Sequence, residues 1–318
     1  MSVCEAATPG GARVSRIQVV ASDGVRVPVW LQGPERGPTV VLVHGFPDDH
    51  TVWNPVADLL ATEFRVASFD VRGSGQADRP RRVVAYRLDQ LAADLERVVD
   101  AVSPGRPVHV VAHDWGSVQA WHAITRPGAS ARLASLTSIS GGCLDHVPSW
   151  IAARVKDGPT GWRALGSMWK SPFYMGLLQV PGLGQLVCRS GLVDFAIRWS
   201  ERFVQPSNSA QLADQRALVN AAAVRIYAAN LLPRLLRPRP LPTDVPVNVL
   251  VPRRDVFVTA ATATVSMAWA KHLTIQTIPG GHWVAVQRPS DVAGCVRTFV
   301  RDIDHGVIAA TQVGKATR

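Results

Sequence analysis

Cysteine is scarce in this sequence: it occurs only at positions 4, 143, 188 and 295, and no two cysteines have metal-ligand spacing. Isolated thiols exclude a disulfide framework and favour a reducing compartment. No apolar run approaches the ~20 residues of a membrane-spanning helix; Pro181 and three glycines interrupt the most apolar stretch, 174–187. Residues 1–5 carry neither the basic start nor the apolar core of a secretory signal. We therefore expect a cytoplasmic protein without an integral membrane segment.

Negative charge is also in short supply, with 24 Asp and Glu against 34 Lys and Arg, for a net charge of +10. A basic balance can indicate nucleic-acid binding, but the arginines are spread along the chain. Only 79–82 and 234–239 cluster, both in Pro-rich segments, and no nucleic-acid-binding motif accompanies them. We expect a solvated basic surface, no nucleic-acid partner, and a monomer or homodimer.

Strand and helix patterns alternate over much of the chain. Two short alternating runs flank Asp23-Gly24 and predict a hairpin of residues 17–20 and 25–31. The later strands are near-continuous apolar runs, which are typical of a parallel sheet covered by helices on both faces. The predicted strands are 39–43, 65–69, 107–111, 133–138, 245–251 and 273–278, and the predicted helices are 52–61, 86–102, 117–126, around 260–270, and 291–301.

The alternation stops between residues 142 and 244, where helical periodicity continues without strands and four of the ten tryptophans occur. We interpret 142–244 as a helical cap inserted between two parts of one α/β core, 15–141 and 245–304. Residues 1–14 and 305–318 are expected to be disordered tails.

The segment 110–117 carries the strongest chemical signal. A β-branched run ends in Ala112-His113-Asp114-Trp115-Gly116, and a helical pattern follows at once. Small residues two places before and after a central residue are typical of a nucleophile elbow, a sharp strand-to-helix turn. Here the central residue is Asp114, so we expect a carboxylate that attacks a saturated carbon and forms an ester.

Asp255 and His282 follow Asp114 in the order expected for a catalytic triad, and each comes just after a predicted strand. Active sites in open parallel sheets form at the carboxyl ends of strands. Alone, Asp255 could be a helix N-cap and His282 a loop histidine. Together they predict a base, His282, that takes a proton from water while Asp255 steadies the imidazolium.

Residues 44–47, His-Gly-Phe-Pro, follow the strand 39–43 and indicate an oxyanion hole. The backbone N–H groups of Phe46 and Trp115 are the expected donors to the Asp114 carbonyl oxygen, and such a donor contributes ~3–4 kcal/mol. The glycine turn 70–75 lacks the Lys-Ser/Thr ending of a phosphate loop and is interpreted as structural.

These motifs together resemble the α/β-hydrolase-fold epoxide hydrolases, over residues 17–302. The similarity is closest to the hydrolase domain fused, in some bacterial proteins, to a short-chain dehydrogenase; that second part is not expected here, because no Gly-x-x-x-Gly-x-Gly turn follows. The matching residues are His44–Pro47, Asp70, Arg72, Gly73, Gly75, His113–Gly116, Asp255 and Gly281–Trp283.

The resemblance implies hydrolysis of an epoxide to a vicinal diol without cofactor or metal, assisted by two cap tyrosines that protonate the epoxide oxygen. Tyr174 matches the first tyrosine. The place of the second reads Asn230-Leu231-Leu232, so Tyr227, about one helical turn earlier, is the candidate, with a half-buried packing role as the alternative. We expect Phe46, Trp115 and Trp283 to contact the substrate. The apolar, tryptophan-rich cap favours a bulky apolar epoxide.

Two other functions stay open. A haloalkane dehalogenase shares the Asp nucleophile but commonly has an Asn where this chain has Phe46, and its cap lacks acid tyrosines. A binding module on the same fold would be favoured by loss of a catalytic residue, and here only the second tyrosine is displaced.

Overall fold

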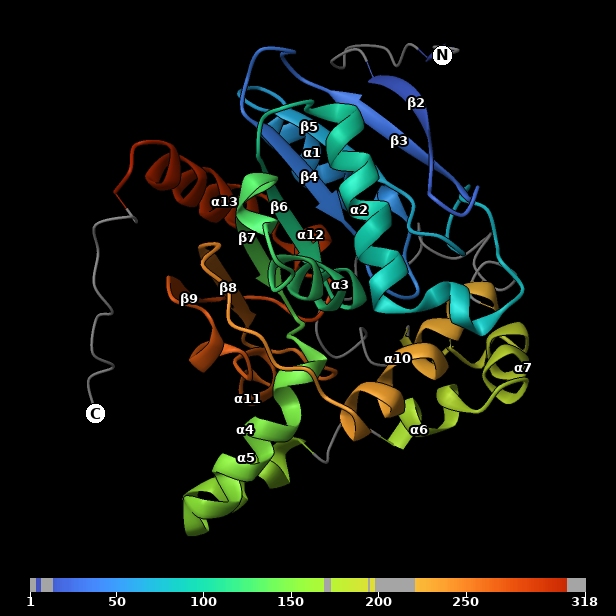
Figure 1. The fold of residues 1–318 in the computed structure, drawn as a ribbon, viewed down its shortest axis with the longest axis vertical. Helices are drawn as coiled ribbons and strands as arrows, with labels where there is room; N and C mark the ends of the chain where they lie inside the picture. The colour runs from blue at the N-terminus through green and yellow to red at the C-terminus, as the bar shows by residue number, and fades with distance from the viewer. Residues whose placement is uncertain (1–3, 7–13, 169–172, 194, 198–220, 308–318) are drawn as a thin grey trace.

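The computed structural model describes residues 4–6, 14–168, 173–193, 195–197 and 221–307. They build one nine-stranded sheet in the order β1-β2-β3-β5-β4-β6-β7-β8-β9 (Figure 1). The pairs β1–β2, β2–β3 and β3–β5 are antiparallel, and all later neighbours are parallel. The predicted α/β class with a mostly parallel sheet is therefore confirmed. The strands are β1 (Cys4–Ala6), β2 (Val14–Val20), β3 (Arg26–Gln32), β4 (Thr39–Val43), β5 (Arg65–Phe69), β6 (Val108–His113), β7 (Leu133–Ile139), β8 (Val247–Pro252) and β9 (Leu273–Ile278).

Helices cover both faces of the sheet, which explains the uninterrupted apolar strands. Successive strand residues point to opposite faces. In β4, Val41 and Val43 pack in one core cluster with α2 and α3, whereas Val40 and Leu42 pack in a second with α1, α12 and α13. These core elements are η1 (His50–Trp53), α1 (Asn54–Leu60), η2 (Val83–Tyr86), α2 (Leu88–Val102), α3 (Trp115–Ile124), η3 (Ala129–Ala131), α11 (Ala260–Ala263), η5 (Met267–Trp269), α12 (Val284–Gln287) and α13 (Pro289–Asp304).

Between β7 and β8 the regular elements among the described residues are helices, and Thr243 forms an isolated bridge with Ala270, which lies beyond β8. Figure 1 shows these helices beyond the arrowheads of β4, β6 and β7, the position expected of a cap. None of the described helices is long and apolar enough to cross a membrane. The helices are η4 (Leu144–His146), α4 (Val147–Lys156), α5 (Gly158–Met168), α6 (Phe173–Gln179), α7 (Leu183–Arg189) and α10 (Arg225–Leu236).

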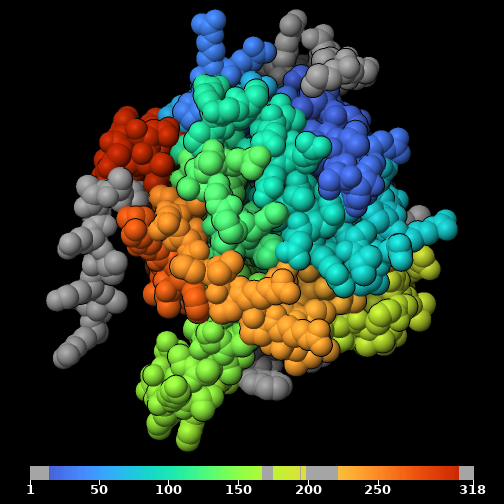
Figure 2. All heavy atoms as spheres, in the orientation of Figure 1, coloured from blue at the N-terminus to red at the C-terminus, as the bar shows by residue number. Residues whose placement is uncertain are grey.

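The last of these helices, α10, is fastened to the core by polar side chains. Buried Asn230 accepts a hydrogen bond from the N–H of Leu88 (2.8 Å), the first residue of α2, and donates to the carbonyl of Tyr86 (2.7 Å). One turn later, Arg234 pairs with Asp89 (3.0 Å) and with buried Asp145 (3.3 Å). Figure 2 shows α10, in orange, lying directly against the cyan surface of η2 and α2. We call Asn230 and Arg234 the α10 clamp.

The glycine turn at 70–75 has the structural role expected from its sequence. The guanidinium of Arg72 is fully buried and pairs with Asp94 of α2 and with Asp23 of the β2–β3 hairpin. A buried cation of this kind needs paired charges and satisfied hydrogen bonds, and both are present here. The turn therefore joins the hairpin to the helix layer.

Three local features differ from what the sequence alone indicates. Residues 1–14 and 305–318 were expected to be disordered tails. Within these two ranges the structure describes Cys4–Ala6, which forms β1, Val14, which begins β2, and residues 305–307; the others lie outside the described residues. An edge strand presents unpaired backbone groups on which a further segment can pair, as β1 does on β2. The helix expected around 260–270 ends at Ala263, where the Thr264 hydroxyl bonds back to the Ala260 carbonyl (2.9 Å) and competes with helix formation. The short helix α12 was not predicted.

Candidate active site

Asp114 occupies a strained turn between β6 and α3. Its backbone angles are φ 52° and ψ −124°, a region that residues other than glycine rarely adopt. The turn also needs a small residue next to it: a Cβ on Gly116 would overlap the carbonyl oxygens of Val43 and His44. Strain of this kind persists where the surroundings over-determine it, and it concentrates at functional sites. The geometry is that of the predicted elbow.

Both predicted oxyanion donors face the Asp114 carboxylate. The N–H of Phe46 donates to Oδ1 (2.9 Å), and the N–H of Trp115 also hydrogen-bonds this side chain. The segment 44–47, which follows β4, can approach Asp114 closely because Gly45 has no side chain. A Cβ on Gly45 would lie 2.5 Å from the Asp114 Cβ.

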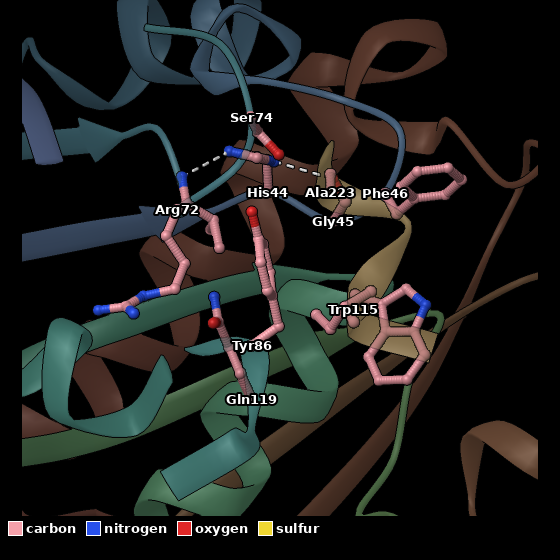
Figure 3. A pocket seen from close by; sticks show the side chains of 11 residues that line it. His44, Gly45, Phe46, Arg72, Ser74, Tyr86, Trp115, Gln119 and Ala223 are labelled. Atoms are coloured by element: carbon pink, nitrogen blue, oxygen red, sulfur yellow. Dashed lines mark hydrogen bonds between the residues drawn. The ribbon is translucent and has the colours of Figure 1, made fainter. Parts of the chain in front are cut away.

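His44 holds that segment in place. Its Nε2 accepts a hydrogen bond from the Val71 N–H (2.9 Å), which leaves Nδ1 to donate to the Gly45 carbonyl (2.8 Å). Figure 3 shows His44, Gly45, Phe46 and Trp115 around a small pocket. The histidine is therefore a structural support for the segment that presents the Phe46 N–H.

Asp255 and His282 come together as predicted. Nδ1 of His282 lies 3.1 and 3.0 Å from the two carboxylate oxygens of Asp255. Nε2 of the same ring lies 3.7 Å from Oδ2 of Asp114. That separation is too long for a direct hydrogen bond, so the ring faces the nucleophile without being bound to it.

Burial and charge shift the pKa values of these three groups. Burial raises the pKa of Asp114 to about 6, although the charge of His282 and the two N–H donors oppose the shift. Burial alone would lower the pKa of His282, but the carboxylates of Asp255 and Asp114 outweigh it and raise the pKa to about 9. Burial acts to raise the pKa of Asp255, but His282, Ser140 and the Val258 N–H reverse this and lower it to about 2. Perturbed, paired groups of this kind are typical of functional sites.

A cavity of about 200 Å³ opens onto Asp114. Its polar lining is sparse, and its apolar lining comes from the core and from cap helices α6 and α10. A mainly apolar cavity with a few convergent polar groups is the usual form of a small-molecule site. The apolar lining residues are Trp115, Val118, Leu144, Val147, Met175, Leu231, Leu235, Phe257, Val258 and Val265.

Tyr227 of α10 lines the same cavity as Asp114 and is buried. Its ring packs edge-on against Phe46 (5.4 Å between centroids) and Trp115 (4.9 Å), the two residues that supply the N–H donors. Tyr174 belongs to α6, but its side chain lies outside the described part of the structure. Met175, its neighbour in sequence, lines the cavity.

Of the three predicted substrate contacts, only Trp115 lines this cavity as described. The Phe46 ring borders the smaller pocket of Figure 3. Trp283 is buried in the second core cluster, and its indole N–H donates to Asp48 (2.8 Å). Neither ring lines this cavity, and contact of Phe46 and Trp283 with the substrate stays a prediction.

Sequence reasoning missed Ser140, whose hydroxyl donates to Oδ2 of Asp255 (2.6 Å) and which borders the cavity. The only available signal was its place at the end of a predicted strand next to that of Asp114. It also missed Leu231 and Leu235, which continue the Tyr227 side of α10 along the cavity.

One group among the described residues has metal-ligand spacing: Asp49, His50 and Asp70. Asp70 there accepts hydrogen bonds from His50 Nδ1 (2.7 Å), the His50 N–H (2.9 Å) and the Gln76 N–H (2.6 Å), and Trp30 stacks on the His50 ring. These contacts join loops, so the cluster serves as structural support.

Comparisons with known proteins agree with this fold. A family model described as alpha/beta hydrolase fold matches residues 38–160. The chain is 36% identical over 298 residues to a Mycobacterium tuberculosis protein named probable oxidoreductase EphD, covering 92% of this chain and 50% of that protein. It is 39% identical over 114 residues to epoxide hydrolase A of the same organism, covering 36% of this chain and 34% of that protein.

Solved structures extend the likeness over most of the fold. A structure titled as novel epoxide hydrolases from metagenomes of hot environments superposes with a TM-score of 0.72 at 22% identity, covering 90% of this chain and 98% of that chain. The chain spans about half the length of the first curated relatives that it matches.

Proposed function

We propose that this chain, which has the α/β-hydrolase fold and resembles epoxide hydrolases, converts an apolar epoxide to a vicinal diol through an ester at Asp114. The observation that carries the proposal is the position of the Asp114 carboxylate. It receives two N–H donors, lies 3.7 Å from a histidine paired with Asp255, and shares an apolar cavity with Tyr227.

In the first step, Asp114 attacks one carbon of the epoxide ring. Oδ1 accepts the Phe46 N–H, so Oδ2 is the nucleophile. A carbon–oxygen bond forms to Oδ2, the ring carbon–oxygen bond breaks, and the leaving oxygen takes a proton from the Tyr227 hydroxyl, assisted by Tyr174. A positioned acid of this kind typically contributes 10²–10⁴-fold.

In the second step, water hydrolyses the ester. His282 Nε2 takes a proton from water, and the resulting hydroxide attacks the carboxyl carbon of Asp114. The N–H groups of Phe46 and Trp115 stabilise the negative charge on the carbonyl oxygen, and Asp255 stabilises the imidazolium. Collapse of this intermediate breaks the bond between the carboxyl carbon and the diol oxygen, and that oxygen takes the proton from His282. The proton left on the Asp114 carboxyl group returns to the ionised Tyr227 oxygen, which regenerates both the carboxylate and the tyrosine hydroxyl. Neither step calls for a metal or an organic cofactor.

Haloalkane dehalogenation is the second candidate, because it uses the same nucleophile and base. It needs N–H donors for the leaving halide, and at the corresponding position this chain has Phe46, whose ring packs against Tyr227. Purified protein is offered styrene oxide and, separately, 1-bromobutane. We expect diol from the epoxide and no halide release; bromide release without diol would reverse the assignment.

Removing the hydroxyl of Tyr227 should slow ring opening. We expect Tyr227→Phe to lower the first-order rate of ester formation by about 10²-fold, because the leaving oxygen loses its proton donor. Stopped-flow tryptophan fluorescence measures this rate. Tyr86→Phe is the matched control, since the Tyr86 hydroxyl is directed to the Pro80 carbonyl (3.0 Å) outside the cavity. Equal rates in both variants and the parent protein would assign Tyr227 to packing alone.

The pH dependence of ester formation should follow Asp114. The nucleophile must be ionised, and its pKa is about 6. We therefore expect kcat/KM to be level above pH 7 and to fall toward a tenfold loss per pH unit below pH 6. An unshifted carboxylate, with a pKa near 4, would keep full activity at pH 5. Initial rates with styrene oxide in buffers of constant ionic strength distinguish the two curves.

A further inference from the structure

Four neighbouring strands each deliver one polar residue to the site at their carboxyl ends. Asp114 follows β6, Ser140 follows β7, Asp255 comes after β8 and His282 after β9. The proposed reaction uses the first, third and fourth of these residues. In strand order Ser140 lies between the nucleophile, Asp114, and the acid, Asp255. It has no role in the reaction as proposed above.

Ser140 adopts a strained backbone. Its φ is 53°, and among the described non-glycine residues only Ser140 and Asp114 have positive φ. Glycine adopts this region without penalty. A serine in this strained conformation indicates that its side chain has a function.

The Ser140 hydroxyl has a specific partner, Oδ2 of Asp255, at 2.6 Å. The other carboxylate oxygen, Oδ1, accepts the N–H groups of Phe257 (2.9 Å) and Val258 (2.8 Å). Those two donors belong to the same loop as Asp255 and move with it. Ser140 instead belongs to the end of β7, so its hydrogen bond ties the carboxylate to a neighbouring strand of the sheet.

Resting on the proposed function, we propose that Ser140 is a positioning residue for ester hydrolysis: its hydroxyl fixes Asp255 in register with His282, so that the imidazole can take a proton from water. Ring opening uses Asp114 and a proton donor only, and is independent of this contact. Loss of the hydroxyl should slow the second step selectively.

Two substitutions separate the hydroxyl from the strain. Ser140→Ala removes the hydroxyl and keeps the Cβ at positive φ, whereas Ser140→Gly removes both the hydroxyl and the strain. The stabilities of the two variants should differ, but both variants should change the His282 titration and the rate of ester hydrolysis in the same way. Ser135→Ala is the control, because Ser135 is a buried serine of the same strand that contacts His109 (2.8 Å) and not Asp255.

The first measurement needs no substrate: the pH titration of the His282 ring nitrogens by ¹⁵N NMR. The charged or titratable groups around His282 are Asp255, Asp114, Asp48 and His113, and every variant keeps them. We expect the pKa of His282 to fall by about one unit in both Ser140 variants, a tenfold weaker hold on the proton, and to stay unchanged in Ser135→Ala. An unchanged or raised pKa in the Ser140 variants overturns the proposal.

The second measurement is single-turnover kinetics with styrene oxide. Ester formation should stay within twofold of the parent rate, while ester hydrolysis, measured above pH 9 where the His282 imidazole is unprotonated, should slow about threefold as the base weakens. If the chain opens no epoxide but both variants shift the His282 titration, the proposed function fails and the Ser140 assignment stands. If epoxides are turned over and both variants keep the parent titration and hydrolysis rate, the Ser140 assignment fails alone.

Discussion

Asp114→Ala should lower epoxide turnover by about five orders of magnitude or more, since removing a covalent nucleophile costs on this scale in other enzymes. Neither His282 nor Tyr227 can form the ester in its place. Diol binding should survive, because Trp115 and the apolar cavity wall remain. Product analysis by chromatography and diol titration by calorimetry measure the two effects.

The matched control is Asp100→Ala, which removes an exposed carboxylate paired with Arg132 and should leave turnover within twofold. Turnover that survives in Asp114→Ala would mean direct attack by water and would exclude the ester. A parent protein with no turnover at all, but with intact ligand binding, would favour the binding-module alternative.

Isotope labelling tests the ester bond to Asp114 through the oxygen atoms of the product. In heavy-oxygen water, the first diol formed by each enzyme molecule should carry the light oxygen of Asp114, because hydrolysis breaks the bond at the carboxyl carbon. Repeated cycles should then place the heavy isotope in the peptide that contains Asp114. Label in the first diol would indicate that water attacks the epoxide itself.

His282→Gln should stop the reaction halfway. Ring opening does not need the base, so the ester forms, but water is no longer activated and turnover falls by about 10⁴-fold. Intact-protein mass spectrometry should show one added epoxide mass per chain, located on Asp114 by peptide mapping. His272→Gln is the control, because His272 precedes β9 at the amino end of the strand, away from the site.

Two results would contradict this account. A His282→Gln protein that turns over at the parent rate would need another base. A protein that forms no adduct, although its fold is intact by circular dichroism, would place His282 in ring opening as well.

The core of this fold could be predicted because its strands are apolar on both faces. β4, β5 and β9 match their predicted ranges residue for residue, and the β2–β3 hairpin follows from Asp23-Gly24. The proximity of Asp114, Asp255 and His282 could also be predicted, because each follows a predicted strand and the carboxyl ends of parallel strands lie at one edge of the sheet.

Contacts between distant segments could not be predicted in this way. The Ser140 hydroxyl reaches Asp255, which is 115 positions away, and nothing in its local sequence distinguishes it from any strand-end serine. Trp283 follows the catalytic histidine, but its bond to Asp48 spans 235 positions and turns its ring into the core. Asn230 was noted for the tyrosine missing after it, while its own side chain joins α10 to the start of α2.

The α10 clamp has a consequence for how a substrate is received. Because Asn230 and Arg234 bind α10 to the start of α2, we expect the helix that carries Tyr227 to keep its place when a ligand fills the cavity. The proposed proton donor is thus preorganised, and no free energy of binding is spent on bringing it into position. Entry of a ligand must then depend on other parts of the cavity wall, and α10 serves as its stationary side.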